Sequence, residues 1–201
     1  TITITGNGVH AALPHLGTDT IVAAGALTQA LQAIVSRSID PHQQLVLSIT
    51  QIHGGHSLNA LPDNVEMRGT LRYFDPDVAR TAHRRMHEII EGIARTHAVE
   101  IALDLRSQYP VTANDPDAAG IMLNAAELAP AGGVAITQFL PSMASEDFAF
   151  MLAARKGAYA WIGNGRSTAL HNPEFDFNDE ILPLGAQYWV ALAQACQKHP
   201  A

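Results

Sequence analysis

The sequence predicts an α/β protein built in two parts. Short segments alternate apolar and polar residues with the period of a strand, longer segments repeat apolar residues at helical spacing, and the order of these segments changes after residue 110. The 201 residues are 47% hydrophobic, so the chain is long and apolar enough to bury a core.

The first part begins with a strand, a loop and a helix. The alternating "TITIT" at 1–5 predicts the strand, and the glycines and proline of 6–17 predict the loop. Asp19 can then cap a helix that ends near Ser38, since apolar residues recur between them at helical spacing.

Three more strands and a second helix complete this part. Segments 44–52 and 64–74 are strand-like and flank the loop "HGGHSLNALPD". An amphipathic helix is expected from Pro76 to about Thr96, and 99–110 is expected to close the part as a strand. The order strand, helix, strand, strand, helix, strand is the split βαβ, ferredoxin-like arrangement.

The second part alternates helices and strands. We expect a helix around 115–129, a short strand near 134–139, a helix opened by "SEDFAFMLAA", a strand "AYAWIG" at 158–163 and a final helix at 180–198. Two strands are too few for a covered parallel sheet. The segment therefore resembles the end of a larger α/β domain that begins before residue 1, and we place the boundary between the parts near 111.

Composition narrows the functional class. Lys plus Arg number 12 and Asp plus Glu 19, a net charge of −7, which argues against a nucleic-acid binder. No apolar run is long enough to span a bilayer. The single cysteine, Cys196, fits a reducing compartment, so we expect a soluble, cytoplasmic protein. The chain opens on a strand without an initiating methionine, and we expect its natural N-terminus to lie upstream.

Loops and strands of the first part carry candidate functional side chains. "GVHAALPHLGTD" holds His10 and His15 in a loop restricted by Pro14, and a turn with polar tips explains it as well as a functional role does. Asn59 precedes a proline that ends its loop. Arg72 lies in a strand, where its two-pronged guanidinium pairs with a carboxylate, either of the protein or of a ligand.

Five blocks of the chain together resemble a known family. In this order they are similar to the second half of the N-acyl-amino-acid amidohydrolases (hippurate hydrolases), of the aminoacylase and carboxypeptidase group of metallopeptidase-like enzymes. The resemblance covers nearly all of the chain, and its blocks are "GNGVHAALPHLGTDTIVAA", "QIHGGHSLNALPDNVEMRGTLRYF", "ASEDFAFML", "AYAWIGNG" and "LHNPEFDFNDEILPLGAQYW".

The resemblance implies a domain plan and a cofactor. Residues 1–111 resemble a ferredoxin-like lid, through which such proteins form homodimers, and 112–201 resemble the C-terminal part of an α/β catalytic domain. The catalytic domain of that family carries two divalent metal ions, zinc or manganese, and cobalt or nickel also accept such ligands.

The resemblance also implies roles for five residues. His171, in "LHNPEFDFND", matches the family's last metal ligand, and His10 matches the lid histidine that polarises the scissile carbonyl. Asn59 and Arg72 match lid positions that bind the substrate carbonyl and carboxylate, and Glu146, in "SEDF", matches a loop that borders the substrate.

The implied function is metal-dependent hydrolysis of the amide of N-acyl amino acids, with hippurate-like or N-acetyl amino acids as substrates. The family's first half carries an HxCGHD-like ligand motif and a Glu-Glu pair, and neither occurs in the 201 residues. Since a hydrolytic metal site needs about three protein ligands, we expect these 201 residues alone to be inactive. The alternatives are a dipeptidase or deacetylase of the same superfamily, and a non-catalytic dimerisation or binding module.

Overall fold

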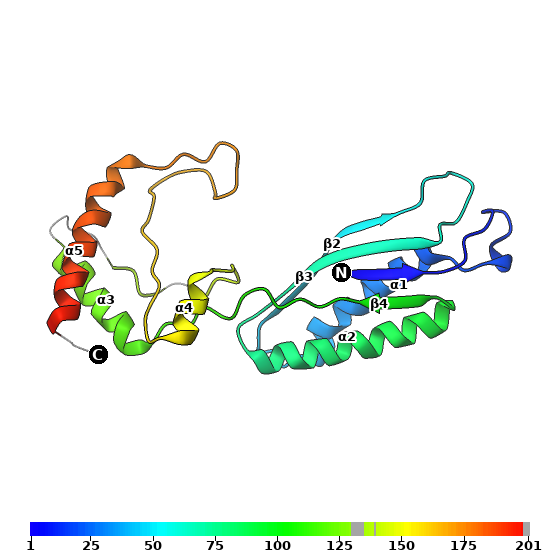
Figure 1. Cartoon of the computed structure of the whole chain (residues 1–201), viewed down its shortest axis with the longest axis horizontal. Coiled ribbons are helices and arrows are strands. Elements are labelled where there is room, and N and C mark those ends of the chain that lie inside the picture. The colour runs from blue at the N-terminus through cyan, green and yellow to red at the C-terminus, as the bar shows by residue number, and fades with distance from the viewer. Residues whose placement is uncertain (130–134, 139, 199–201) are drawn as a thin grey trace. The chain divides into compact units, whose positions relative to one another are not determined.

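The computed structural model describes residues 1–129, 135–138 and 140–198. The chain divides into two compact units, Thr1–Gln108 and Tyr109–Ala201 (Figure 1). None of the described helices combines the length and apolar character needed to cross a membrane.

The first unit is built on a four-stranded antiparallel sheet. Its strands lie in the order β2-β3-β1-β4, and their bounds are β1 Ile2–Thr5, β2 Leu45–Gly54, β3 Asn64–Tyr73 and β4 Glu100–Leu103. The central β1 pairs with both β3 and β4, and its Ile2 and Ile4 are buried. Hydrophobic residues of alternating strand positions thus reach one face of the sheet.

Two helices cover that face. Helix α1, Thr20–Ala33, continues into a π-helical turn, Ile34–Ser38, and α2 spans Pro76–His97. Asp19 caps α1 as expected, its Oδ1 accepting from the backbone N of Val22 at 2.9 Å. The core joins the helices to the sheet through buried apolar side chains, among them Ile4, Leu27, Leu31, Val65, Met67, Val78 and Met86.

The elements of this unit occur in the predicted order, but the last strand is shorter than predicted. We expected a strand over 99–110, and β4 ends at Leu103. Among the described strands its one neighbour is β1, and the pairing stops where β1 begins, with the backbone N of Asp104 bonded to Thr1 O at 2.9 Å. Without a partner, the residues that follow have no ladder to join.

The regular elements of the second unit, in the residues described, are helices. The unit contains α3 Pro116–Leu128, α4 Phe148–Ala154, a 3₁₀ turn Asp179–Ile181 and α5 Leu182–Lys198, with α3 packed along α5. The two predicted strands of this part are absent from the described residues: neither 135–138 nor 158–163 is a strand, and 134 and 139 lie outside those residues. A strand needs a neighbour for its backbone groups, and the backbone of Tyr159 bonds instead to the side chain of Asn114.

Candidate functional site

Loops 6–17 and 55–63 of the first unit are joined by a ladder of backbone hydrogen bonds that continues the pairing of β1 with β3. His10 forms an isolated β-bridge with Ala60, which places it beside Asn59. The rungs are Gly6 N to Asp63 O (2.7 Å), Leu61 N to Val9 O (2.8 Å) and Ala11 N to Asn59 O (2.9 Å). The structure therefore brings together His10 and Asn59, which lie 49 positions apart in the sequence.

A tight approach of the two backbones maintains this loop pair. A Cβ on Gly8 would lie 2.4 Å from the carbonyl oxygen of Leu61, so only glycine fits there. The Gly8 N–H donates to Asp63 Oδ1 at 2.8 Å. Beneath the loops, the fully buried Thr20 of α1 donates its hydroxyl to Pro62 O at 2.8 Å. Asp63 thus supports the position of His10, a role that sequence reasoning missed although "NALPD" contains the residue.

The exposed imidazole of His10 has a defined orientation. Its Nδ1 accepts a hydrogen bond from the backbone N of Ala12 at 3.1 Å. In a neutral imidazole whose Nδ1 accepts, the proton resides on Nε2. His10 can therefore donate a hydrogen bond from Nε2 to an external acceptor such as a carbonyl oxygen.

Asn59 is oriented in a comparable way. Its Oδ1 accepts from the hydroxyl of Ser57 at 2.8 Å, which leaves the Nδ2 group as the donor end of an exposed carboxamide. The loop pair thus presents two uncharged N–H donors, from His10 and Asn59, that suit a carbonyl or carboxylate oxygen.

Arg72 lies away from the loop pair. It is half-buried on β3, opposite Val46 of β2, on the sheet face that the helices leave open. Arg72 lies eight residue steps along β3 from Asn64, which directly follows the loop pair, and at about 3.3 Å per step this distance is roughly 25 Å. The structure does not bring Arg72 to His10 and Asn59 within one chain.

Glu146 lies half-buried just before α4 in the second unit. Its Oε1 accepts from the backbone N of Phe148 at 3.3 Å. A hydrogen bond from the Tyr159 hydroxyl is the main cause that lowers the pKa of this carboxyl below its usual range. Sequence reasoning missed Tyr159, because the alternation of "AYAWIG" was interpreted as a strand.

His171 lies at the tip of a closed loop, 164–178, and its side chain is exposed. Its backbone adopts the left-handed conformation with φ 66°, which is uncommon for a residue with a side chain and typical of functional sites. Side-chain hydrogen bonds close the loop beneath it: Asn164 Nδ2 to Asp176 O (3.0 Å), Asn178 N to Asn164 Oδ1 (2.8 Å) and Thr168 Oγ1 to Glu174 O (2.7 Å).

The candidate metal ligand has no companions within the part of the chain that the structure describes. There, no three His, Cys, Asp or Glu side chains are grouped so that they could hold a metal ion. An exposed imidazole on a fixed loop suits one position in a metal site, so His171 fits as a single ligand and the described residues do not complete the site.

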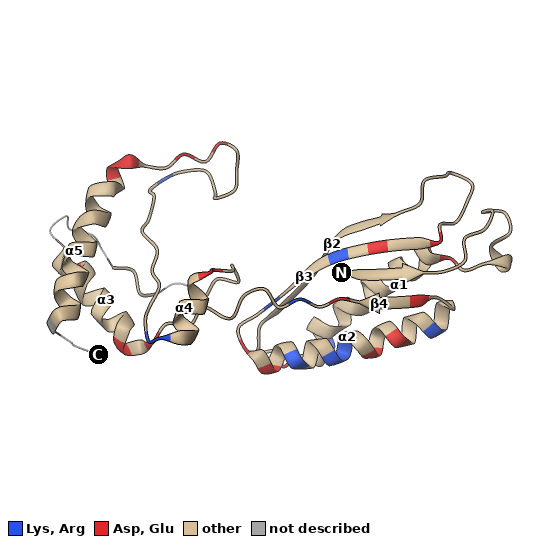
Figure 2. Ribbon diagram, viewed as in Figure 1, with Lys and Arg blue, Asp and Glu red and all other residues tan. Residues whose placement is uncertain are grey.

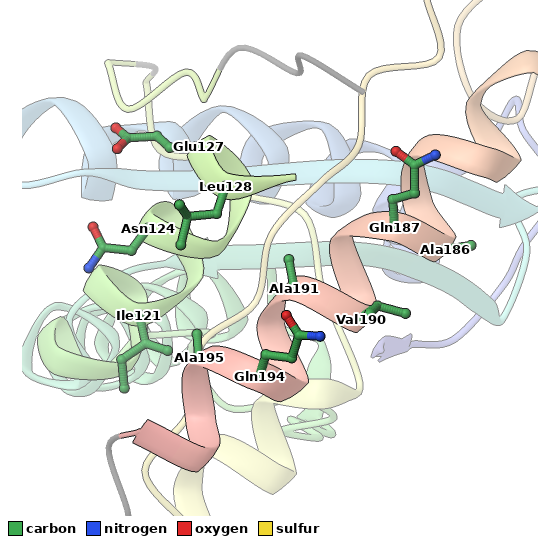
Figure 3. Close-up of a pocket in the computed structure, with 10 residues that line it drawn as sticks. All are labelled: Ile121, Asn124, Glu127, Leu128, Ala186, Gln187, Val190, Ala191, Gln194 and Ala195. Atoms are coloured by element: carbon green, nitrogen blue, oxygen red, sulfur yellow. The ribbon is translucent and has the colours of Figure 1, made fainter. Parts of the chain in front are cut away.

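A hollow of about 670 Å³ between α3 and α5 is a separate feature of the second unit (Figure 3). Apolar side chains such as Ile121 and Val190 and the amides of Asn124 and Gln194 line it, and among the described lining residues only Glu127 is titratable. These described residues offer neither a nucleophile nor a metal ligand set, so the hollow is a poor candidate for catalysis.

Basic and acidic side chains are interspersed along α2 rather than gathered by sign (Figure 2). Arg84 and Arg85 both pair with Glu88, and Arg80 pairs with Asp77. These pairs lower the pKa of the Glu88 carboxyl and leave this helix without the basic face that phosphates require.

Comparisons with known proteins agree on one family. Residues 7–195 match the model of peptidase family M20/M25/M40. The chain is 34% identical over 192 residues to hippurate hydrolase of Campylobacter jejuni, covering 96% of this chain and 50% of that protein. It is 35% identical over 189 residues to N-acetyl-L-cysteine deacetylase of Bacillus subtilis, covering 94% and 44%.

A solved structure also matches this chain over about half of its own length. A dinuclear metal-binding peptidase of the M20 family from Bacillus subtilis aligns with a TM-score of 0.68 and 28% identity, covering 96% of this chain and 49% of that one. The chain therefore spans about half the length of the relatives that it matches.

Replacement of Asp63 by alanine tests the loop pair. Asp63→Ala removes the acceptor of the Gly8 N–H, and losing one net hydrogen bond costs about 1 kcal/mol. We expect amide exchange of Ala11 and Leu61 to become roughly fivefold faster, measured by NMR, with the amides of β1 unchanged. Asp40→Ala is the matched control, since Asp40 also accepts a backbone N–H, from His42 at 2.9 Å, outside these loops. Equal exchange rates in the two variants would contradict the role of Asp63.

Proposed function

Because the chain belongs to peptidase family M20/M25/M40, we propose that it is the second half of a metal-dependent amidohydrolase that cleaves the amide of N-acyl amino acids. The adjacency of His10 and Asn59 on the loop pair carries this proposal: each side chain presents an uncharged N–H donor, and such donors suit the oxygen of a scissile carbonyl. Relatives named hippurate hydrolase and N-acetyl-L-cysteine deacetylase support hippurate-like or N-acetyl amino acids as substrates.

His171 supplies one ligand of a site for two divalent ions, zinc or manganese, and the residues of the longer protein supply the others. When bound, such ions make a water nucleophilic near neutral pH and polarise a carbonyl. The chain's own part is to hold the imidazole of His171 at the end of a closed loop. The side chains of Asn164 and Thr168 brace that loop through their hydrogen bonds.

The two units would have different tasks. The first, with its βαββαβ order, is a ferredoxin-like lid. The second is the C-terminal part of an α/β catalytic domain. Its helices expose large apolar side chains that a completed domain would cover: Leu128 is 70% exposed, Trp189 63% and Val190 60%.

The positions of the lid residues support a homodimer. An N-acyl amino acid is far shorter than the roughly 25 Å of strand between Arg72 and the loop pair. Arg72 and the loop pair of one chain therefore cannot contact the same substrate molecule. Two chains can, if the loop pair of one lid reaches the active site of the partner. Arg72 then binds the substrate carboxylate through its guanidinium while the partner's loop pair donates to the carbonyl.

The metal-ligand assignment is tested by His171→Asn in the longer protein. Asparagine tolerates the left-handed backbone of this position, so the loop is preserved while the imidazole is lost. We expect metal content, measured by elemental analysis, to fall and hydrolysis to be abolished, with an unchanged circular dichroism spectrum. His42→Asn, which changes an exposed histidine of the first unit, is the control. Full metal content in His171→Asn would contradict the assignment of His171 as a metal ligand.

His10 is tested by its effect on the rate. His10→Ala should lower kcat roughly a hundred- to thousandfold, the effect of removing one oxyanion donor, with metal content and thermal stability unchanged. Mixing the inactive His10→Ala and His171→Asn proteins should restore activity, since a mixed dimer keeps one site with both histidines. A kcat within a few-fold of wild type for His10→Ala would remove His10 from the mechanism, and no recovery in demonstrated mixed dimers would exclude action across the interface.

A further inference from the structure

Two histidines of α2 lie next to each other on one side of the helix. His83 and His87 are four positions apart in the middle of this 22-residue α-helix. Side chains at this spacing are neighbours on a helix surface, with Cβ atoms about 5–6 Å apart. Because both residues belong to one regular helix, its backbone alone sets the distance between the two side chains.

Both imidazoles are available to a ligand. His87 is exposed and His83 is half-buried, and neither ring has a hydrogen-bond partner within the part of the chain that the structure describes. Burial, followed by the charge of His87, lowers the pKa of His83, which favours the neutral ring that binds metal ions. Two adjacent imidazoles on one helix face are a ligand arrangement that suits zinc, copper and nickel ions.

The charges around the pair leave room for a cation. Between residues 77 and 91 of α2, three acidic side chains balance three arginines (Figure 2). Each arginine is also paired with a carboxylate, Arg80 with Asp77 and both Arg84 and Arg85 with Glu88. An ion at the two histidines is therefore not opposed by an uncompensated basic surface on this helix.

We propose that His83 and His87 together bind one divalent transition-metal ion, such as zinc, through one nitrogen of each ring. Among the described residues no third His, Cys, Asp or Glu joins them. With two protein ligands rather than the three or four of a complete zinc site, the ion is held reversibly, and water fills its remaining positions. The site is independent of the proposed hydrolysis, because its ligands belong to α2 alone.

A bound ion would also stabilise the helix. It links two successive turns of α2, and an ion that binds the folded helix more tightly than the unfolded chain favours the folded state. Since α2 packs on the sheet through its buried residues Val78, Ala82 and Met86, a more stable α2 stabilises the first unit.

Titration of the 201-residue chain with zinc chloride, followed by the NMR signals of each imidazole, tests the pair. We expect the signals of His83 and His87 to change together, with one dissociation constant roughly a hundredfold below that of His97, since the second ligand binds intramolecularly. His97 is the matched control, because it is half-buried on the same helix but follows an isoleucine, Ile93, by four positions. A response at the zinc concentration that His97 needs, or two different constants, would overturn the site.

A variant distinguishes the pair from a single histidine. His87→Gln replaces an exposed side chain with a good helix former, so the fold is kept and one ligand is lost. His83 should then need roughly a hundredfold more zinc, whereas His97→Gln should leave the affinity of the pair unchanged. Binding of zinc by His83 at its wild-type concentration in His87→Gln would refute a shared ion.

Amide hydrogen exchange tests the stabilisation. Saturating zinc should slow exchange of the α2 amides and should have no such effect in His87→Gln. Helix α3, which contains neither histidine nor cysteine, is the internal control, and its exchange should not change. Exchange in α2 that zinc leaves unaltered would contradict the stabilising role of the ion.

Discussion

The hydrogen-bonded pairing of β1 with β3 is the interaction on which the geometry of the first unit depends. The ladder runs from Ile2 opposite Met67 to Thr5 opposite Asn64, and it continues through the loops to the bond between Ala11 and Asn59. Because β1 is central and its isoleucines are buried, the core of the unit holds the ladder in register. The candidate catalytic loops are in this way an extension of the best-buried part of the sheet.

In the second unit, a different kind of interaction holds the backbone in place. Side-chain amides, rather than neighbouring strands, bind the backbone of its extended segments: Asn114 clamps Tyr159, and Asn164 with Asn178 closes the loop that carries His171. These bonds fix the backbone of Tyr159 and close the loop that carries His171, while the helices expose apolar faces. The exposed apolar faces of these helices support the proposal that the unit is part of a larger α/β domain.

Local patterns predicted the first unit well, because alternation and helical spacing report directly on which face of an element is buried. The same rule erred where a segment has no strand partner among the described residues: β4 ends at Leu103, and 158–163 is not a strand. Whether a segment forms a strand depends on a neighbouring strand to which its backbone can hydrogen-bond. The local sequence does not contain that neighbour.

The candidate site, like the fold, could be predicted only in part from the sequence. Residue types and motif resemblance picked out His10 and Asn59, but their adjacency depends on a ladder between loops that are far apart in the sequence. The supporting residues Asp63 and Tyr159 were missed for the same reason, since each acts through a contact that only the fold creates. Sequence reasoning thus found the side chains with distinctive chemistry more readily than those that position them.

The central claim, that this chain is one half of a metal-dependent amidohydrolase, is tested most directly by comparing two proteins in one assay. The release of amino acid from hippurate and N-acetylalanine would be measured with added zinc or manganese, for the 201-residue chain and for a longer protein that also contains the preceding half. The account predicts metal-dependent turnover by the longer protein and none by the 201 residues, whose described part offers no complete metal site. Metal-dependent turnover by the 201-residue chain alone, or none by the longer protein, would contradict it.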